Sequence, residues 1–152
     1  RDSQRRILKA IPHSGMAVSS DLGDSLDVHP RHKKEIGERL ARQALCHTYH
    51  RAILPSGPLF RKIKTEGKQA ILEFDYAEDL KTADGQALRT FETAGDNGIF
   101  YPATAIIKGN RIIVESEKVS RPHAVRYGWQ PFTRGNLVNK DNLPASTFRT
   151  DL

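Results

Sequence analysis

The segment 19–30 gathers the residue types in this chain that are best suited to chemistry. It reads Ser-Ser-Asp-Leu-Gly-Asp-Ser-Leu-Asp-Val-His-Pro, so three carboxylates lie within nine residues of His29. A histidine in such a place can accept a proton from a serine hydroxyl through one ring nitrogen. An aspartate at the other nitrogen fixes the tautomer and stabilises the imidazolium ion. The alternative from spacing alone is that His29 caps the following helix while the aspartates solvate the loop.

The elements on either side of this loop predict one α/β unit. Met16-Ala17-Val18 is a short apolar run typical of a strand buried in a parallel sheet, and residues 3–10 are typical of the end of a helix. A second helix is expected from about Pro30, because proline is well tolerated at the first helical position. Open α/β sheets hold catalytic groups in the loops at the carboxyl ends of their strands. The order strand, loop, helix therefore places His29 where such a group is expected.

This α/β unit, residues 1–54, cannot bury both of its faces by itself. Its second helix carries apolar residues at helical spacing, namely Ile36, Leu40, Ala41, Ala44, Leu45 and Tyr49. We therefore expect an exposed apolar surface at residues 16–18 and along this helix. A segment outside this chain is expected to cover it.

The pattern changes after Leu54-Pro55-Ser56-Gly57-Pro58, where two prolines and a glycine interrupt regular structure. Apolar and polar residues then alternate, and turn signals such as Lys108-Gly109-Asn110 recur at short intervals. These features predict an antiparallel β-sandwich over residues 58–152. The expected strands cover 68–75, 98–107, 111–116 and 123–130. The polar tail 131–152 is expected to be irregular and to pack along the outside of a domain.

Composition excludes several classes of function. The net charge is +6, but the basic residues are scattered, and the densest run, residues 31–34, is followed at once by Glu35 and Glu38. That pattern is typical of a solvated helix face, so no nucleic-acid partner is expected. No apolar run approaches the roughly 20 residues that span a bilayer. The single cysteine, Cys46, has no neighbours at zinc-site spacing, so neither a membrane nor a metal is expected.

Several short blocks, in one order along nearly the whole chain, resemble a known family. They are Gly15-Met16-Ala17-Val18, Asp21-Leu22-Gly23-Asp24, Val28-His29-Pro30 with Lys34, Gly37, Arg39 and Leu40, and then Gly135-Asn136-Leu137, Leu143-Pro144-Ala145-Ser146 and Phe148-Arg149-Thr150. Together they resemble the C-terminal portion of the sialate O-acetylesterase family, carbohydrate esterases of the SGNH (GDSL-type) hydrolase superfamily. The resemblance implies that residues 1–54 are the last strand, loop and helix of a flavodoxin-like catalytic domain.

The resemblance also implies that His29, just before the last helix of that domain, is the general base. The aspartate that orients it is either Asp24 or Asp27. Many members of the superfamily place this aspartate three residues before the histidine, but that position here is Leu26. Asp24 is slightly favoured, because it belongs to a block that resembles the family. A Ser-His dyad assisted by a backbone carbonyl is a further alternative.

Gly23-Asp24-Ser25-Leu26 spells the GDSL motif, which invites Ser25 as the nucleophile. In such hydrolases that block follows the first strand of a complete domain, whereas only one helix follows here before the β region. A nucleophile four residues from its own base would also need an unusual loop. We therefore expect the nucleophile to lie outside this chain.

The function that the resemblance implies is removal of O-acetyl groups from sugars by a serine mechanism, without a metal or organic cofactor. The serine and the oxyanion donors are expected in a missing N-terminal catalytic segment, either a separate subunit or removed sequence. Without them the isolated chain is expected to be inactive. The family leads us to expect a periplasmic, secreted or lysosomal protein. The alternative function is a noncatalytic carbohydrate-binding β-sandwich.

Overall fold

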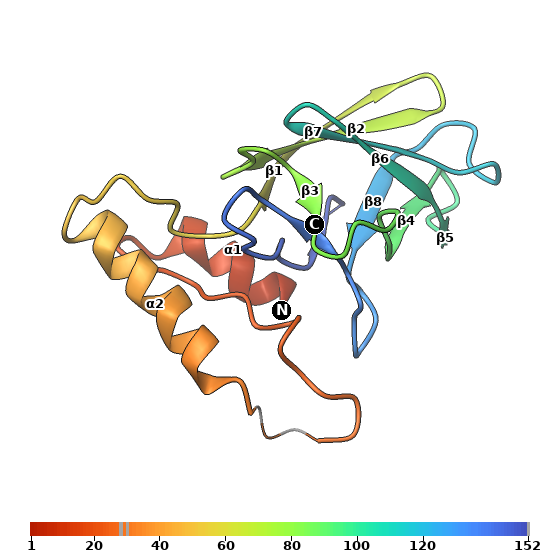
Figure 1. Cartoon of the computed structure of the whole chain (residues 1–152). Coiled ribbons are helices and arrows are strands. Elements are labelled where there is room, and N and C mark those ends of the chain that lie inside the picture. The colour runs from red at the N-terminus through yellow and green to blue at the C-terminus, as the bar shows by residue number, and fades with distance from the viewer. Residues whose placement is uncertain (28, 30, 152) are drawn as a thin grey trace.

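The computed structural model describes residues 1–27, 29 and 31–151 (Figure 1). Two helices precede a region of strands. The helices are α1 (Asp2–Ala10) and α2 (Lys33–His47), and the strands are β1 (Leu59–Glu66), β2 (Gln69–Asp75), β3 (Lys81–Thr82), β4 (Phe91–Ala94), β5 (Phe100–Pro102), β6 (Thr104–Lys108), β7 (Arg111–Glu115), β8 (Ala124–Tyr127), β9 (Leu137–Val138) and β10 (Phe148–Arg149).

The strands form two four-stranded antiparallel sheets and one short strand pair. One sheet has the order β1-β2-β7-β6, the other β10-β8-β4-β5, and β3 pairs with β9. Their inner faces enclose a core that includes Leu72, Ile112, Val125 and Phe148, each fully buried. The burial of β2 alternates residue by residue, as expected for a strand with one face inside and one outside. The predicted antiparallel sandwich is therefore confirmed.

The chain passes from one sheet to the other at Ala103. The expected strand 98–107 is two strands, since β5 pairs with β4 in one sheet and β6 pairs with β7 in the other. The backbone N–H of Ala103 donates to the carbonyl oxygen of Phe91 at this corner. The next turn follows the prediction, because Gly109 adopts φ +59° and Lys108 pairs directly with Arg111.

The tail 131–152 is mostly irregular, as predicted, but the prediction that it packs along the outside of the domain is wrong. The tail contributes β9 and β10, and Phe148 lies in the core, with its ring stacked on that of Phe60 at 4.9 Å between centroids. The polar composition of the tail does not indicate this burial, because a polar residue such as Asn139 can be fully buried when its hydrogen bonds are satisfied. The Asn139 side chain donates to the carbonyl oxygens of Ser56 and Tyr76 and accepts from the backbone N–H of Leu143.

The strand predicted at Met16-Ala17-Val18 has no strand partner among the described residues. The reason is that a strand requires a second strand to pair with it, and none of the described segments takes that place. The segment instead faces α2 through side-chain hydrogen bonds, given below. The helix that follows begins at Lys33, after His32 with non-helical backbone angles, and not at about Pro30, which lies outside the described residues.

Helix α2 buries none of its residues. Leu40 is 52% exposed and Tyr49 is 68% exposed, whereas Ile36 and Met16-Ala17-Val18 are half-buried. The exposed apolar surface expected along the helix is present at Leu40, but residues 16–18, which were expected to be exposed as well, are half-buried. Figure 1 shows α2 and the loop before it extending away from the sheets. Neither described helix is long and apolar enough to cross a membrane.

Two arginines fasten the helical region to the sandwich. Arg5 of α1 is buried with its ion-pair partner Asp2, and its guanidinium lies over the ring of Phe60. Arg42 of α2 donates to the carbonyl oxygen of Leu54 and forms an ion pair with Asp141. These contacts join both helices to the strand region.

Candidate active site

The structure brings His29 and Asp27 together. The Nδ1 atom of His29 lies 3.0 Å from Oδ1 of Asp27, and the same oxygen accepts the backbone N–H of His29 at 2.8 Å. One carboxylate therefore fixes both the backbone and the ring of the histidine. Nε2 has no hydrogen-bond partner among the described residues, which leaves this nitrogen available for proton transfer.

Asp24 lies in a turn of its own. Its Oδ1 accepts the backbone N–H of Leu26 at 2.8 Å, and the described contacts include none between Asp24 and the His29 ring. The side chain of an aspartate readily bonds the backbone two residues further on. The same geometry explains Asp27, because His29 is two residues beyond it. The two aspartates that sequence left as alternatives therefore have different surroundings.

His29 is strongly exposed for a group with a hydrogen-bonded carboxylate. Its side chain is 89% exposed and that of Asp27 is 40% exposed. Ser25 and Leu26 are also exposed, and no described hydrogen bond links Ser25 to His29. As far as the described residues of this segment show, the pair lies open to water.

Arg39 of α2 anchors the start of the loop. Its guanidinium donates two hydrogen bonds to the carboxylate of Asp21, at 2.7 and 2.6 Å, and a third to the carbonyl oxygen of Val18 at 2.5 Å. Sequence reasoning noted Arg39 only for the resemblance and did not predict this contact. Arg39 and Gln43 are four residues apart and therefore lie on the same face of α2, and this spacing of two polar side chains was the available signal.

Gln43 fastens the segment before the loop in the same way. Its side-chain amide donates to the carbonyl oxygens of Met16 and Pro55, at 3.1 and 2.8 Å. The Gln43 side chain passes close to Gly15, where an added Cβ would lie 2.9 Å from Oε1. A glycine at position 15 therefore leaves room for the contact that joins α2 to the extended segment.

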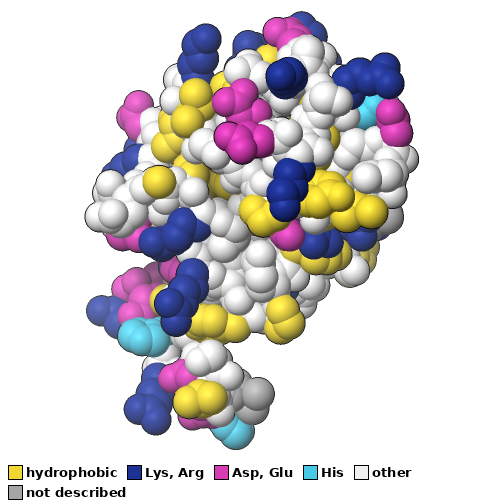
Figure 2. Space-filling model, turned by 90° about the vertical axis from the view of Figure 1, so that its right-hand side faces the viewer, with side chains coloured by type: hydrophobic (Ala, Val, Ile, Leu, Met, Phe, Trp, Pro, Cys, Tyr) yellow, Lys and Arg dark blue, Asp and Glu magenta, His cyan; other side chains and the backbone are white. Residues whose placement is uncertain are grey.

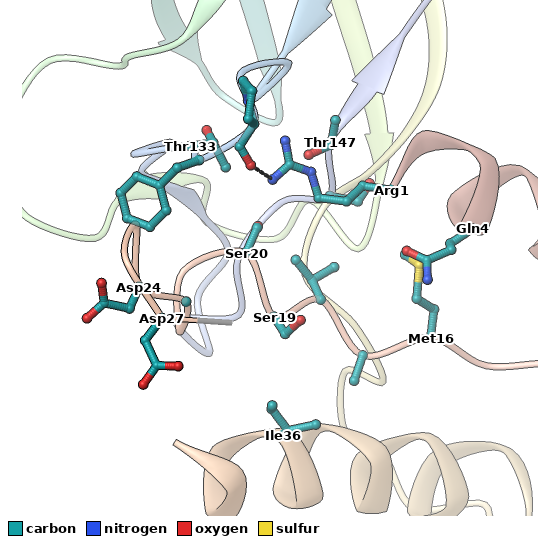
Figure 3. Close-up of a pocket in the computed structure, with 16 residues that line it drawn as sticks. Arg1, Gln4, Met16, Ser19, Ser20, Asp24, Asp27, Ile36, Thr133 and Thr147 are labelled. Atoms are coloured by element: carbon teal, nitrogen blue, oxygen red, sulfur yellow. Dashed lines mark hydrogen bonds between the residues drawn. The ribbon is translucent and has the colours of Figure 1, made fainter. Parts of the chain in front are cut away.

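A cavity of about 410 Å³ lies beside the loop (Figure 3). Both regions of the chain line it, with Ser19, Asp24 and Asp27 from the loop, Ile36 from α2, and Thr133 and Thr147 from the sandwich. In Figure 3 the carboxylates of Asp24 and Asp27 lie on one side and point away from Arg1. Small-molecule sites have volumes of roughly 300–1,000 Å³, so the cavity is large enough for a small ligand.

The surface of the protein carries both positively and negatively charged side chains. Figure 2 shows Lys and Arg side chains interspersed with Asp and Glu on the face drawn there, without a continuous basic stripe. At the start of α2 the pKa of Glu35 is lowered by a backbone hydrogen bond and by a hydrogen bond from His32. Among the described residues, no group of three or more His, Cys, Asp or Glu side chains could hold a metal ion.

These observations define an antiparallel β-sandwich joined to a helical segment that presents a His-Asp pair. The chain is similar over 98% of its length to the crystal structure of a carbohydrate acetylesterase from Xanthomonas citri, with 42% sequence identity and a TM-score of 0.92. It spans 35% of the length of that protein. No protein-family profile matches the chain, and no curated protein matches it in sequence. The structural likeness supports a relationship with carbohydrate esterases.

Proposed function

We propose that this chain is the histidine-bearing part of a serine carbohydrate O-acetylesterase of the sialate O-acetylesterase family, within the SGNH superfamily. The observation that carries the proposal is the 3.0 Å contact between Nδ1 of His29 and the carboxylate of Asp27. A carboxylate at Nδ1 holds the proton on that nitrogen and leaves Nε2 as the base. The likeness to an acetylesterase supports the same reaction class.

In the proposed reaction, a serine hydroxyl outside these 152 residues attacks the carbonyl carbon of an acetyl ester. His29 accepts the hydroxyl proton at Nε2 and then donates it to the sugar oxygen as the carbon–oxygen bond of the ester breaks. Asp27 stabilises the imidazolium ion in between and keeps its own negative charge. Water, deprotonated by the same His29, then attacks the acetyl-serine. His29 returns that proton to the serine oxygen as its ester bond breaks, and acetate is released.

The apolar surface of the helical region supports the presence of a covering segment. Gln43 and Arg39 occupy the carbonyls of Met16 and Val18, which point toward one edge of the extended segment. Ala17 lies between them, so its backbone groups face the opposite edge. We propose that a strand of the catalytic segment pairs there and that the same segment covers Leu40 on α2. This arrangement would also shield His29 from water.

The proposal is tested by measuring acetate release from acetylated oligosaccharides and from a chromogenic acetate ester. The 152-residue chain alone is expected to be inactive, and the chain joined to a preceding catalytic segment is expected to be active. Ser25→Ala in the joined protein should retain full activity. Turnover by the isolated chain that Ser25→Ala abolishes would overturn the proposal. Glycan binding with no turnover in the joined protein would favour a carbohydrate-binding module instead.

A further inference from the structure

Arg39 connects the two ends of the loop that carries His29. The loop leaves the extended segment after Val18 and ends at Lys33, where α2 begins, and Arg39 lies in the second turn of that helix. The Arg39 guanidinium binds the Val18 carbonyl oxygen and both carboxylate oxygens of Asp21. The Arg39 side chain therefore joins the start of the loop to the helix that follows it, and Asp21 and Arg39 are 18 positions apart in sequence.

The other hydrogen bonds of the loop are local. Leu22 donates to Ser19, Leu26 to Asp24, and His29 to Asp27, so each spans two or three residues. Such bonds set the shape of short turns but do not fix a loop relative to the rest of a protein. Among the described residues, two ion pairs join the loop to α2. His32–Glu35 spans only three residues at the helix start, whereas Asp21–Arg39 reaches from the other end of the loop.

The geometry of this pair is that of a strong contact. Two parallel N–H···O bonds join a guanidinium to a carboxylate, and the Arg39 side chain is 13% exposed and that of Asp21 30% exposed. Bidentate pairs of this kind combine energy with a defined orientation. On the same helix, the Lys34–Glu38 pair is long, at 3.7 Å, and its side chains are well exposed. Exposed pairs contribute little to stability, which makes Lys34 a matched control.

We propose that Arg39, through Asp21, is a positioning residue that sets where His29 stands relative to the rest of the active site. The inference rests on the proposed role of His29 as the base. The His29 side chain is exposed and held within its loop by Asp27, so its position depends on how the loop itself is anchored. Without the Asp21–Arg39 pair the loop is closed only by its local turns, which we expect to open more often, so that the position of His29 is less well defined.

The first measurement is hydrogen exchange of the backbone amides of residues 22–29, followed by mass spectrometry. Arg39→Ala and Asp21→Asn are expected to raise exchange there by about tenfold or more, because the loop is then closed only by local turns. Exchange in β2 and β7 should not change, which shows that the variants are folded. Lys34→Ala should match the unaltered protein in both regions. Unchanged exchange over 22–29 in both variants would overturn the proposal.

The second measurement is steady-state kinetics of the chain joined to its catalytic segment. Misplacing a catalytic group by about 1 Å can cost roughly 100-fold in rate, so Arg39→Ala should lower kcat by about 10- to 100-fold. KM should stay within about twofold, because Arg39 contacts the loop and not the substrate. Arg39→Lys keeps the positive charge but loses the paired N–H donors of the guanidinium, so its kcat should lie between those of Arg39→Ala and the unaltered protein.

Two outcomes separate this inference from the proposed function. If the joined protein has no esterase activity while Arg39→Ala still raises exchange over residues 22–29, the anchor stands and the function fails. If the joined protein is active and Arg39→Ala leaves kcat unchanged, or raises KM alone, Arg39 does not position the base and the inference is overturned.

Discussion

The carboxylate of Asp27 contacts His29 twice, through the imidazole Nδ1 at 3.0 Å and through the backbone N–H at 2.8 Å. A short side chain two residues before the histidine can do both because it folds back in a tight turn. The contact therefore sets the ring and the backbone of His29 together. Asp24 makes the same kind of turn, in which its Oδ1 accepts the backbone N–H of Leu26.

We predict that Asp27→Asn lowers kcat of the joined protein far more than Asp24→Asn does. Asparagine at position 27 retains the turn but removes the negative charge that holds the tautomer and stabilises the imidazolium. We expect a loss of roughly 10²- to 10⁴-fold for Asp27→Asn and less than about threefold for Asp24→Asn. Steady-state kinetics on one acetylated substrate make the comparison, and the reverse order of losses would assign the orienting role to Asp24.

Tyr127 joins the sandwich core to the tail, and its ionisation is expected to lower the stability of the folded protein at alkaline pH. Burial raises the pKa of the Tyr127 phenol to about 12, with a smaller upward contribution from the Asp21 carboxylate. The unfolded chain loses this proton near pH 10, so the stability due to the neutral phenol is complete below pH 10 and is lost as pH rises toward 12. Tyr127→Phe should remove this alkaline loss.

At neutral pH the same substitution is expected to destabilise the protein. The buried N–H of Leu137 donates to the Tyr127 oxygen at 3.0 Å and would lose its acceptor, at a cost of about 1–3 kcal/mol. Urea unfolding at pH 7 and at pH 11 measures both effects. An equal loss of stability at the two pH values would contradict the assignment of the alkaline transition to Tyr127.

Asn139→Ala should lower the free energy of unfolding by about 3 kcal/mol or more. The side chain is fully buried, and its removal leaves the Ser56 and Tyr76 carbonyls and the Leu143 N–H without this partner. Each buried polar group without a partner costs about 1–3 kcal/mol. Asn97→Ala is the control, because its side chain accepts one bond in an exposed turn. Similar midpoints in urea for the two variants would contradict this account of the tail.

Gly57→Ala should destabilise the protein, whereas Gly37→Ala should not. A Cβ at position 57 would overlap the carbonyl oxygen of Pro144 and lie 2.7 Å from that of Leu143, both backbone atoms that cannot move aside cheaply. Overpacking of this kind costs about 1–3 kcal/mol. Gly37 lies in α2 with nothing within 4 Å, so alanine there should stabilise by up to about 1 kcal/mol. Thermal unfolding of both variants makes the comparison.

The sandwich could be predicted from sequence because alternation and turn residues act locally. β2, β7 and the turn at Gly109 follow from period two and from the ease with which glycine adopts positive φ. The burial of the tail could not be predicted, because Asn139 is buried with hydrogen bonds to residues as distant in sequence as Ser56. No local sequence pattern indicates that a polar side chain will form hydrogen bonds with the backbone of a distant segment.

The candidate residues of the site could be named from the sequence, but their arrangement could not. The spacing of His29 and its aspartates indicated acid-base chemistry, yet both Asp24 and Asp27 fitted that spacing. The choice depends on the turn that each one forms. The Asp21–Arg39 pair joins residues 18 positions apart through a loop with no regular period, so only the folded chain shows it. The described residues contain no strand that pairs with the segment predicted as a strand at 16–18.

The measurement that tests the central claim most directly is acetate release by the joined protein with His29 replaced. His29→Ala should lower kcat by roughly 10³-fold or more, because neither attack by serine nor deacylation by water then has a base. Circular dichroism should show the same fold, since the His29 side chain is largely exposed. A kcat within tenfold of the unaltered enzyme would contradict the assignment of His29 as the general base.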